Sequence, residues 1–123
     1  MRGIRPLIEK VLRCERKKVE QINVVFVDDR EIRRLHRHYL GHDCVTDVMS
    51  FPLDEGGKTS GEVYICLNQA ARQAKVYGVS EREELFHLVI HGVLHLLGYK
   101  DDTPGKKRTM RELENKYLAW RNR

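Results

Sequence analysis

The stretch Ser80–Asp102, SEREELFHLVIHGVLHLLGYKDD, predicts the helix around which the rest of the chain folds. Ser80 followed by Glu83 is typical of a capping box, so the helix is expected to begin there. Gly98 fits the left-handed residue that ends a helix, which gives a helix of roughly 17 residues. Between these ends, apolar side chains cover most of the helix circumference. This pattern indicates a helix that is buried in the centre of the protein.

Three histidines, His87, His91 and His95, recur every fourth residue and therefore share one face of this helix. Two imidazoles one turn apart can bind a single metal ion. The alternative is a set of core histidines held by hydrogen bonds. Carboxylates just past the helix end, at Asp101 and Asp102, favour the metal site, with His87 orienting it or bonded in the core.

Gly92 occupies the position at which the H-E-x-x-H metalloproteases carry their general base. The sequence therefore argues against peptidase chemistry. A glycine in the middle of a helix is unfavourable by roughly 1 kcal/mol relative to alanine, so it predicts a close approach by a neighbouring element.

Apolar periodicity and turn residues on either side of this helix indicate an α+β fold in one domain, residues 1–123. On the last helix an apolar stripe is interpreted as core packing; it comprises Met110, Leu113, Tyr117 and Trp120. Outside the central helix, the expected elements are a helix over 4–18, strands at Gln21–Val27, Asp47–Phe51 and Glu62–Leu67, a helix from Asp28 or Asp29 to Tyr39, a helix capped by Asn68 and ended by Gly78, and a helix from Thr103.

Composition gives a net charge of +5 and a pI near 9.2, which favours polyanionic partners. Lysines and arginines cluster at 13–18, 30–37 and 106–111. No membrane span is expected, since the longest apolar run, Leu88–Leu97, is far shorter than the roughly 20 residues required. Three widely spaced cysteines suit a reducing compartment, and no secretory leader is evident, so a cytoplasmic protein is expected.

Three blocks of sequence resemble a known family. The run His91–Tyr99, HGVLHLLGY, is similar to the H-G-x-L-H-L-x-G-Y-D-H signature of the YbeY-type ribosomal-RNA maturation endoribonucleases. Thr46–Pro52 is similar to the family's P-T-D-V-L-S-F-P, and Gly61–Ile65 to its G-D-I-x-I strand. The blocks follow the family's order and the resemblance covers nearly the whole chain.

This resemblance implies a zinc-dependent endoribonuclease that prefers single-stranded RNA and acts in ribosomal-RNA processing and ribosome quality control. One Zn²⁺ per chain, or another divalent ion, would activate a water to attack the phosphodiester. The expected partners are RNA, above all ribosomal RNA, and ribosomal subunit proteins. The implied fold is a small mixed sheet of about four strands packed with about five helices, with the fourth strand sought between Phe51 and Gly61.

The metal ligands expected from the resemblance are His91, His95 and Asp101, the last of which stands where the family has a third histidine. Asp102 is the alternative carboxylate. A family arginine falls on Leu40, so cationic help for the reaction is expected from elsewhere on the second helix, at Arg34 or more specifically Arg37. The predicted catalytic residues are His91, His95, Ser50 and Arg37.

Two other functions remain open from the sequence. A metal-binding helix would serve equally well in a metal-dependent hydrolase of another substrate. The departures at Leu40 and Asp101 are compatible with a catalytically weak protein that binds RNA or the ribosome around a structural metal.

Overall fold

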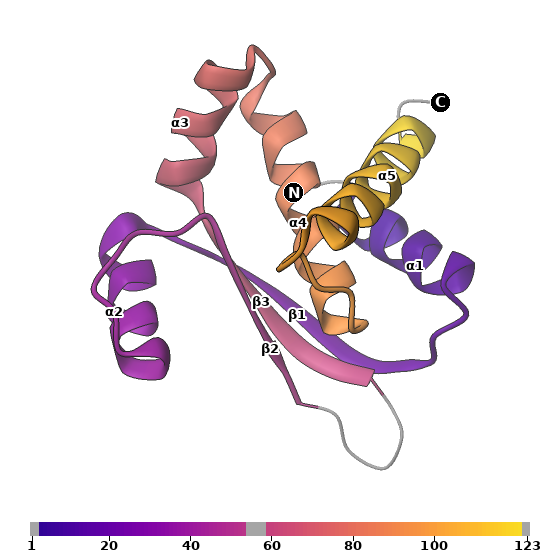
Figure 1. Cartoon of the computed structure of the whole chain (residues 1–123), viewed down its shortest axis with the longest axis horizontal. Helices are drawn as coiled ribbons and strands as arrows, with labels where there is room; N and C mark the ends of the chain where they lie inside the picture. The colour runs from indigo at the N-terminus through magenta and orange to yellow at the C-terminus, as the bar shows by residue number, and fades with distance from the viewer. Residues whose placement is uncertain (1–2, 54–58, 122–123) are drawn as a thin grey trace.

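A computed structural model of the chain describes residues 3–53 and 59–121. Five helices and three strands form its described part (Figure 1). In chain order they are α1 (Ile4–Cys14), β1 (Val19–Val27), α2 (Asp29–Leu40), β2 (Val48–Pro52), β3 (Thr59–Cys66), α3 (Leu67–Tyr77), α4 (Glu81–Leu96) and α5 (Pro104–Arg121). The predicted α+β class is confirmed.

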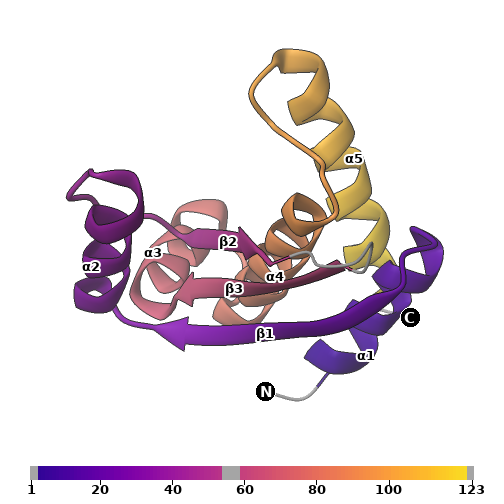
Figure 2. The ribbon, with the colours of Figure 1, turned by 90° about the horizontal axis from the view of Figure 1, so that it is seen from below.

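The strands form one mixed sheet in the order β1-β3-β2, which Figure 2 shows from below. β3 lies in the centre, parallel to β1 and antiparallel to β2. Three strands are therefore present in the described residues, where about four were expected. The fourth strand was expected between Phe51 and Gly61. In that stretch β2 ends at Pro52 and β3 begins at Thr59, and residues 54–58 lie outside the described part of the chain.

α4 is the buried centre of the molecule, as its apolar sequence predicts. One side of it packs on β2 and β3, and α1, α3 and α5 pack around the rest. Figure 1 shows α1, α4 and α5 grouped on one side of the sheet and α2 on the other. The close approach predicted at Gly92 is confirmed, because a Cβ built there would lie 2.4 Å from Val63 Cγ1 on β3.

α2 packs against the opposite face of the sheet and forms a second, smaller apolar cluster. Ile32 and Leu35 of α2 contact Met49 of β2 and Cys66 of β3 in this cluster. Side chains alternate along a strand, so the neighbours of Met49 face the other way, towards α4. One face of β2, the strand at the edge of the sheet, therefore contacts α2, and the other face contacts α4.

The predicted helix ends hold at three places. The Ser80 side chain accepts a hydrogen bond from the Glu83 amide at 3.0 Å, Gly78 ends α3 in the left-handed conformation, and Thr103 accepts from the Lys106 amide at 3.2 Å. Capping depends on residues a few positions apart, so sequence alone locates it well.

Two other boundaries differ from the prediction. α1 ends at Cys14, and the chain turns at Arg16 (φ 56°) because no apolar residue beyond Leu12 holds a further turn on the core before β1 begins. Asn68 does not cap α3, since β3 passes directly into that helix with Cys66 at the N-cap. The Asn68 side chain instead accepts a hydrogen bond from the Asp29 amide at 2.9 Å.

None of the helices in the described residues has the length and apolar character needed to cross a bilayer.

Candidate metal centre

α4 presents its histidines between β2 on one side and α5 on the other. The rings of His91 and His95 have centroids 4.6 Å apart, and their Nε2 atoms are 3.0 Å apart. Their side chains remain 21% and 28% exposed on a helix that is otherwise largely buried. Spacing of four residues on a helix therefore brings two imidazole nitrogens to one accessible point.

The chain beyond α4 returns over the end of the helix and brings a carboxylate to the same point. Gly98 adopts φ +102°, a conformation that favours glycine, and the turn places Asp101 beside the histidines. Asp101 Oδ2 lies 3.6 Å from His91 Nε2 and 3.5 Å from His95 Nε2. Asp102 instead forms an ion pair with Lys106 at 3.2 Å. Of the two carboxylates that the sequence left open, Asp101 is the one that faces the histidines.

The separations among these three atoms fit one small metal ion. A tetrahedral ion bound at about 2.0–2.2 Å by nitrogen and oxygen ligands holds its ligands roughly 3.3–3.6 Å apart. Two edges of the ligand triangle, 3.5 and 3.6 Å, lie within that range, and the edge between the two histidine nitrogens is shorter, at 3.0 Å. His91, His95 and Asp101 can therefore hold a metal ion, and they are the only such group of three found among residues 3–53 and 59–121.

Glu114 of α5 orients His91 from behind. Its carboxylate accepts hydrogen bonds from His91 Nδ1 at 2.5 Å and from His87 Nε2 at 2.9 Å. An ionised carboxylate only accepts hydrogen bonds, so Nδ1 of His91 carries a proton, and in the neutral imidazole this leaves Nε2 as the nitrogen with a lone pair. A carboxylate that holds the far nitrogen of a ligand histidine is a recurrent feature of zinc sites.

The charges behind the triangle are fixed by burial and pairing. Burial favours a raised pKa for Glu114, but hydrogen bonds from His87 and His91 outweigh it and lower the pKa to about 2. Hydrogen bonds to Glu114 and Glu84 raise the pKa of His87 to about 10. His87 is therefore a cation between two carboxylates, and it orients the site as a hydrogen-bonded residue outside the ligand triangle.

Sequence reasoning missed both buried glutamates, Glu84 (2% exposed) and Glu114 (7% exposed). Glu84 continues the network by accepting from the Gln73 side chain at 2.8 Å. The sequence does indicate that Glu114 is buried, because Glu114 stands four residues after Met110 and three before Tyr117, on the apolar face of α5. A carboxylate in such a stripe requires a buried partner.

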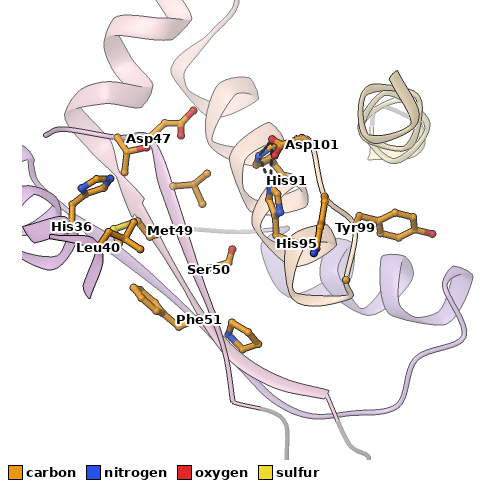
Figure 3. A pocket seen from close by; sticks show the side chains of 15 residues that line it. His36, Leu40, Asp47, Met49, Ser50, Phe51, His91, His95, Tyr99 and Asp101 are labelled. Carbon is orange, nitrogen blue, oxygen red and sulfur yellow. Dashed lines mark hydrogen bonds and ion pairs between the residues drawn. The ribbon is translucent and has the colours of Figure 1, made fainter. Parts of the chain in front are cut away.

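A cavity of about 530 Å³ opens in front of the triangle, between β2, the end of α4 and one face of α2. His91, His95 and Asp101 form one wall (Figure 3). On β2, Ser50 points towards the histidines, while Phe51 lies on the other side of the strand. The cavity thus reaches from the triangle across the edge of the sheet.

Ser50 is held by α4 itself. Its hydroxyl donates to the carbonyl oxygen of Gly92 at 2.9 Å, and its oxygen would lie 3.2 Å from a Cβ at that glycine. The close contact at Gly92 therefore serves both packing and the position of a polar group in the cavity. The structure brings Ser50 to the cavity of His91 and His95, as the resemblance implied.

The second helix contributes differently from expectation. His36 and Leu40 line the cavity, and Leu40 is 55% exposed. Arg37 is not among the lining residues, and Arg34 forms an ion pair with Glu31 at 2.6 Å. The catalytic role expected of Arg37 stays a prediction. Lys100, after α4, supplies a cation to the cavity instead.

Comparison with known proteins matches the whole described fold to one family. The family model described as Endoribonuclease YbeY matches residues 2–121. An Endoribonuclease YbeY of Chloroherpeton thalassium is 41% identical over 116 residues, which cover 94% of this chain and 82% of that protein. One of Bacteroides thetaiotaomicron is 37% identical, with 93% and 83% covered.

A solved structure shows the same fold. The solution structure of TM1509 from Thermotoga maritima is 32% identical in sequence and superposes with a TM-score of 0.71. The match covers 98% of this chain and 83% of that one.

Proposed function

The chain belongs to the YbeY family of endoribonucleases, and from that premise we propose that it cleaves single-stranded RNA with a zinc ion held by His91, His95 and Asp101. The observation that carries this proposal is the ligand triangle, whose edges suit one ion and whose face opens into a cavity. Two imidazoles and one carboxylate also accept other divalent ions, and zinc is favoured by the tetrahedral spacing.

His91, His95 and Asp101 would hold the ion, which when bound would leave one position for water, supply hydroxide near neutral pH and polarise a phosphoryl oxygen. The residues of the chain prepare this chemistry. Glu114 keeps the proton of His91 on Nδ1, so that Nε2 is free to bind. The Ser50 hydroxyl donates its hydrogen bond to the carbonyl oxygen of Gly92, so the Ser50 oxygen can act only as an acceptor within the cavity. Lys100 attracts the phosphate.

The natural substrate in this proposal is ribosomal RNA during processing and ribosome quality control, with ribosomal subunit proteins as partners. Support comes from the family resemblance and from the net charge of +5, which suits a large polyanion. Ser50 is proposed to accept a hydrogen bond from the attacking water or from a hydroxyl group of the substrate. Arg37, on the same helix as the lining residues His36 and Leu40, is assigned to the charge that develops on the phosphate.

The test begins with the metal content of the untagged protein, measured by mass spectrometry in the wild type, Asp101→Ala and Asp102→Ala. We expect about one zinc per chain in the wild type and in Asp102→Ala, and loss in Asp101→Ala, because Asp101 alone of the two faces the histidines. An equal zinc content in the wild type and both variants, or no bound zinc in any of the three proteins after zinc is added, would contradict the ligand triangle.

The second arm measures cleavage of single-stranded ribosomal RNA by the wild type and by His91→Ala. Cleavage that requires zinc and is lost in His91→Ala supports the proposal. Hydrolysis of small esters or amides without RNA cleavage favours the other hydrolase. Tight RNA binding with metal bound but no cleavage favours an RNA-binding protein with a structural metal.

A further inference from the structure

The ligand triangle lies between two hollows. Besides the larger cavity over β2, a cleft of about 200 Å³ opens on the α5 side of the site. Asp47, His91 and Asp101 line both hollows, so the ion position is reached from either side. A strand of nucleic acid crossing the triangle would extend from one hollow into the other.

The cleft has the stronger cationic lining. Lys107 and Arg111 both line it, whereas in the described part of the chain Lys100 is the single lysine or arginine that lines the larger cavity. The two stand four residues apart on α5 and so project from one face of that helix. They come from the basic cluster 106–111, whose other two members, Lys106 and Arg108, do not line the cleft.

Neither cleft cation is engaged elsewhere. Within the described part of the chain, Lys107 and Arg111 form no ion pair, while Lys106 pairs with Asp102 at 3.2 Å. Other arginines are also engaged, for example Arg72 with Asp29 at 2.6 Å. An unpaired cation beside a substrate site is available to bind a phosphate at no loss of an existing pair.

A bound ion would make the cleft positive. Its acidic side chains, Asp47, Asp101 and Glu114, are balanced by three cations, Lys107, Arg111 and the protonated His87. Among these groups the net charge is zero, and a divalent ion makes it two net positive charges. The cleft therefore becomes attractive to phosphate when the ion is present.

We propose that Lys107 and Arg111 form a phosphate-binding subsite for the RNA strand on the α5 side of the ion, opposite the cavity over β2. The substrate then lies across the triangle with phosphates on both flanks. This inference rests on the proposed function, since it adds the second half of the substrate path to that site.

The experiment measures binding of a fluorescent single-stranded oligoribonucleotide by anisotropy at several salt concentrations. Metal-free and zinc-loaded protein are both titrated into the same 2′-O-methyl RNA, whose integrity is checked on a gel after each measurement. The variant is Lys107→Ala/Arg111→Ala. The matched control is Lys75→Ala/Arg108→Ala, which removes the same charge from exposed helix positions that line neither hollow.

We expect the cleft variant to bind at least tenfold more weakly at low salt, with the control much closer to the wild type. The slope of log affinity against log salt should become less negative by about 1.4, since each lost contact with a single strand removes about 0.7. Zinc should strengthen binding by the wild type. The zinc content of the variant should be unchanged, because neither residue belongs to the ligand triangle.

Affinity and salt slope equal to those of the control would overturn the subsite, even if the wild type cleaves RNA as proposed. Conversely, a wild type that binds RNA through these residues but never cleaves it would contradict the proposed function and leave the subsite standing. If the alanine pair does not fold, Lys107→Gln/Arg111→Gln keeps most of the aliphatic stems and is judged by the same measurements.

Discussion

Replacing Glu114 by glutamine should weaken metal binding while the protein remains folded. The carboxylate bonds to His91 at 2.5 Å and to His87 at 2.9 Å, and it is buried. Glutamine has nearly the same shape but only one acceptor oxygen. It can therefore accept from one of the two imidazoles, and its amide group faces the other as a second donor.

The size of the loss follows from these contacts. Removing a carboxylate that orients a ligand histidine typically lowers metal affinity 10–100-fold, or about 1.4–2.8 kcal/mol of binding free energy. The metal-free protein should also lose stability, because the half-buried His87 cation loses one partner. His87 keeps Glu84 at 3.0 Å, so this loss should stay below the roughly 3–5 kcal/mol of a buried pair broken outright.

The assay is competition for zinc between the metal-free protein and a chromophoric chelator, with chemical denaturation of the same samples. Glu112→Gln, an exposed position on the same helix, is the control for the loss of a negative charge from α5. A Glu114→Gln affinity no lower than that of Glu112→Gln would refute the reasoning that the carboxylate orients His91. A protein that unfolds without metal would show that the network holds the fold instead.

Three further predictions test packing and charge around α4. Gly92→Ala should lower the free energy of unfolding by about 1–2 kcal/mol, because the added methyl group overpacks against Val63 by more than the helix-propensity gain of about 1 kcal/mol. A free energy of unfolding in denaturant equal to that of the wild type would contradict the close approach. Metal-free protein should lose stability as pH rises from 6.5 to about 10, because folded His87 retains a proton that the unfolded chain has released. The free energy of unfolding should fall by at most about 1.4 kcal/mol per pH unit. His87→Gln should remove this pH dependence, and a slope that persists in the variant would contradict the cause. Tyr117→Phe should cost about 1–3 kcal/mol in denaturant unfolding, because its buried hydroxyl donates to Glu15, and no loss would show that this bond does not stabilise the fold.

The structure bears out the sequence analysis most closely where the signals are local. The buried helix, its Ser80 cap and the close approach at Gly92 were all predicted, because capping, periodicity and a glycine within a helix depend on residues a few positions apart. Misplaced boundaries, such as the end of α1, arise where the next element of the fold decides how far a helix continues.

The candidate site divides in the same way. The spacing of His91 and His95 determines that two imidazoles meet, because the helix that carries them sets their distance. The carboxylate ligand depends on the turn that follows the helix, because the conformation at Gly98 decides that Asp101 faces the histidines and Asp102 does not.

Sequence alone thus determined the central helix, the family resemblance and the pair of imidazoles, all of which reside in short continuous stretches. Only the tertiary structure decided that Glu114 holds His91 and that Lys107 and Arg111 line the second hollow. The reason is physical: α5 carries Glu114 at a position 23 residues after His91 along the chain. Where it lies depends on how its apolar stripe packs against α4, which local patterns do not specify.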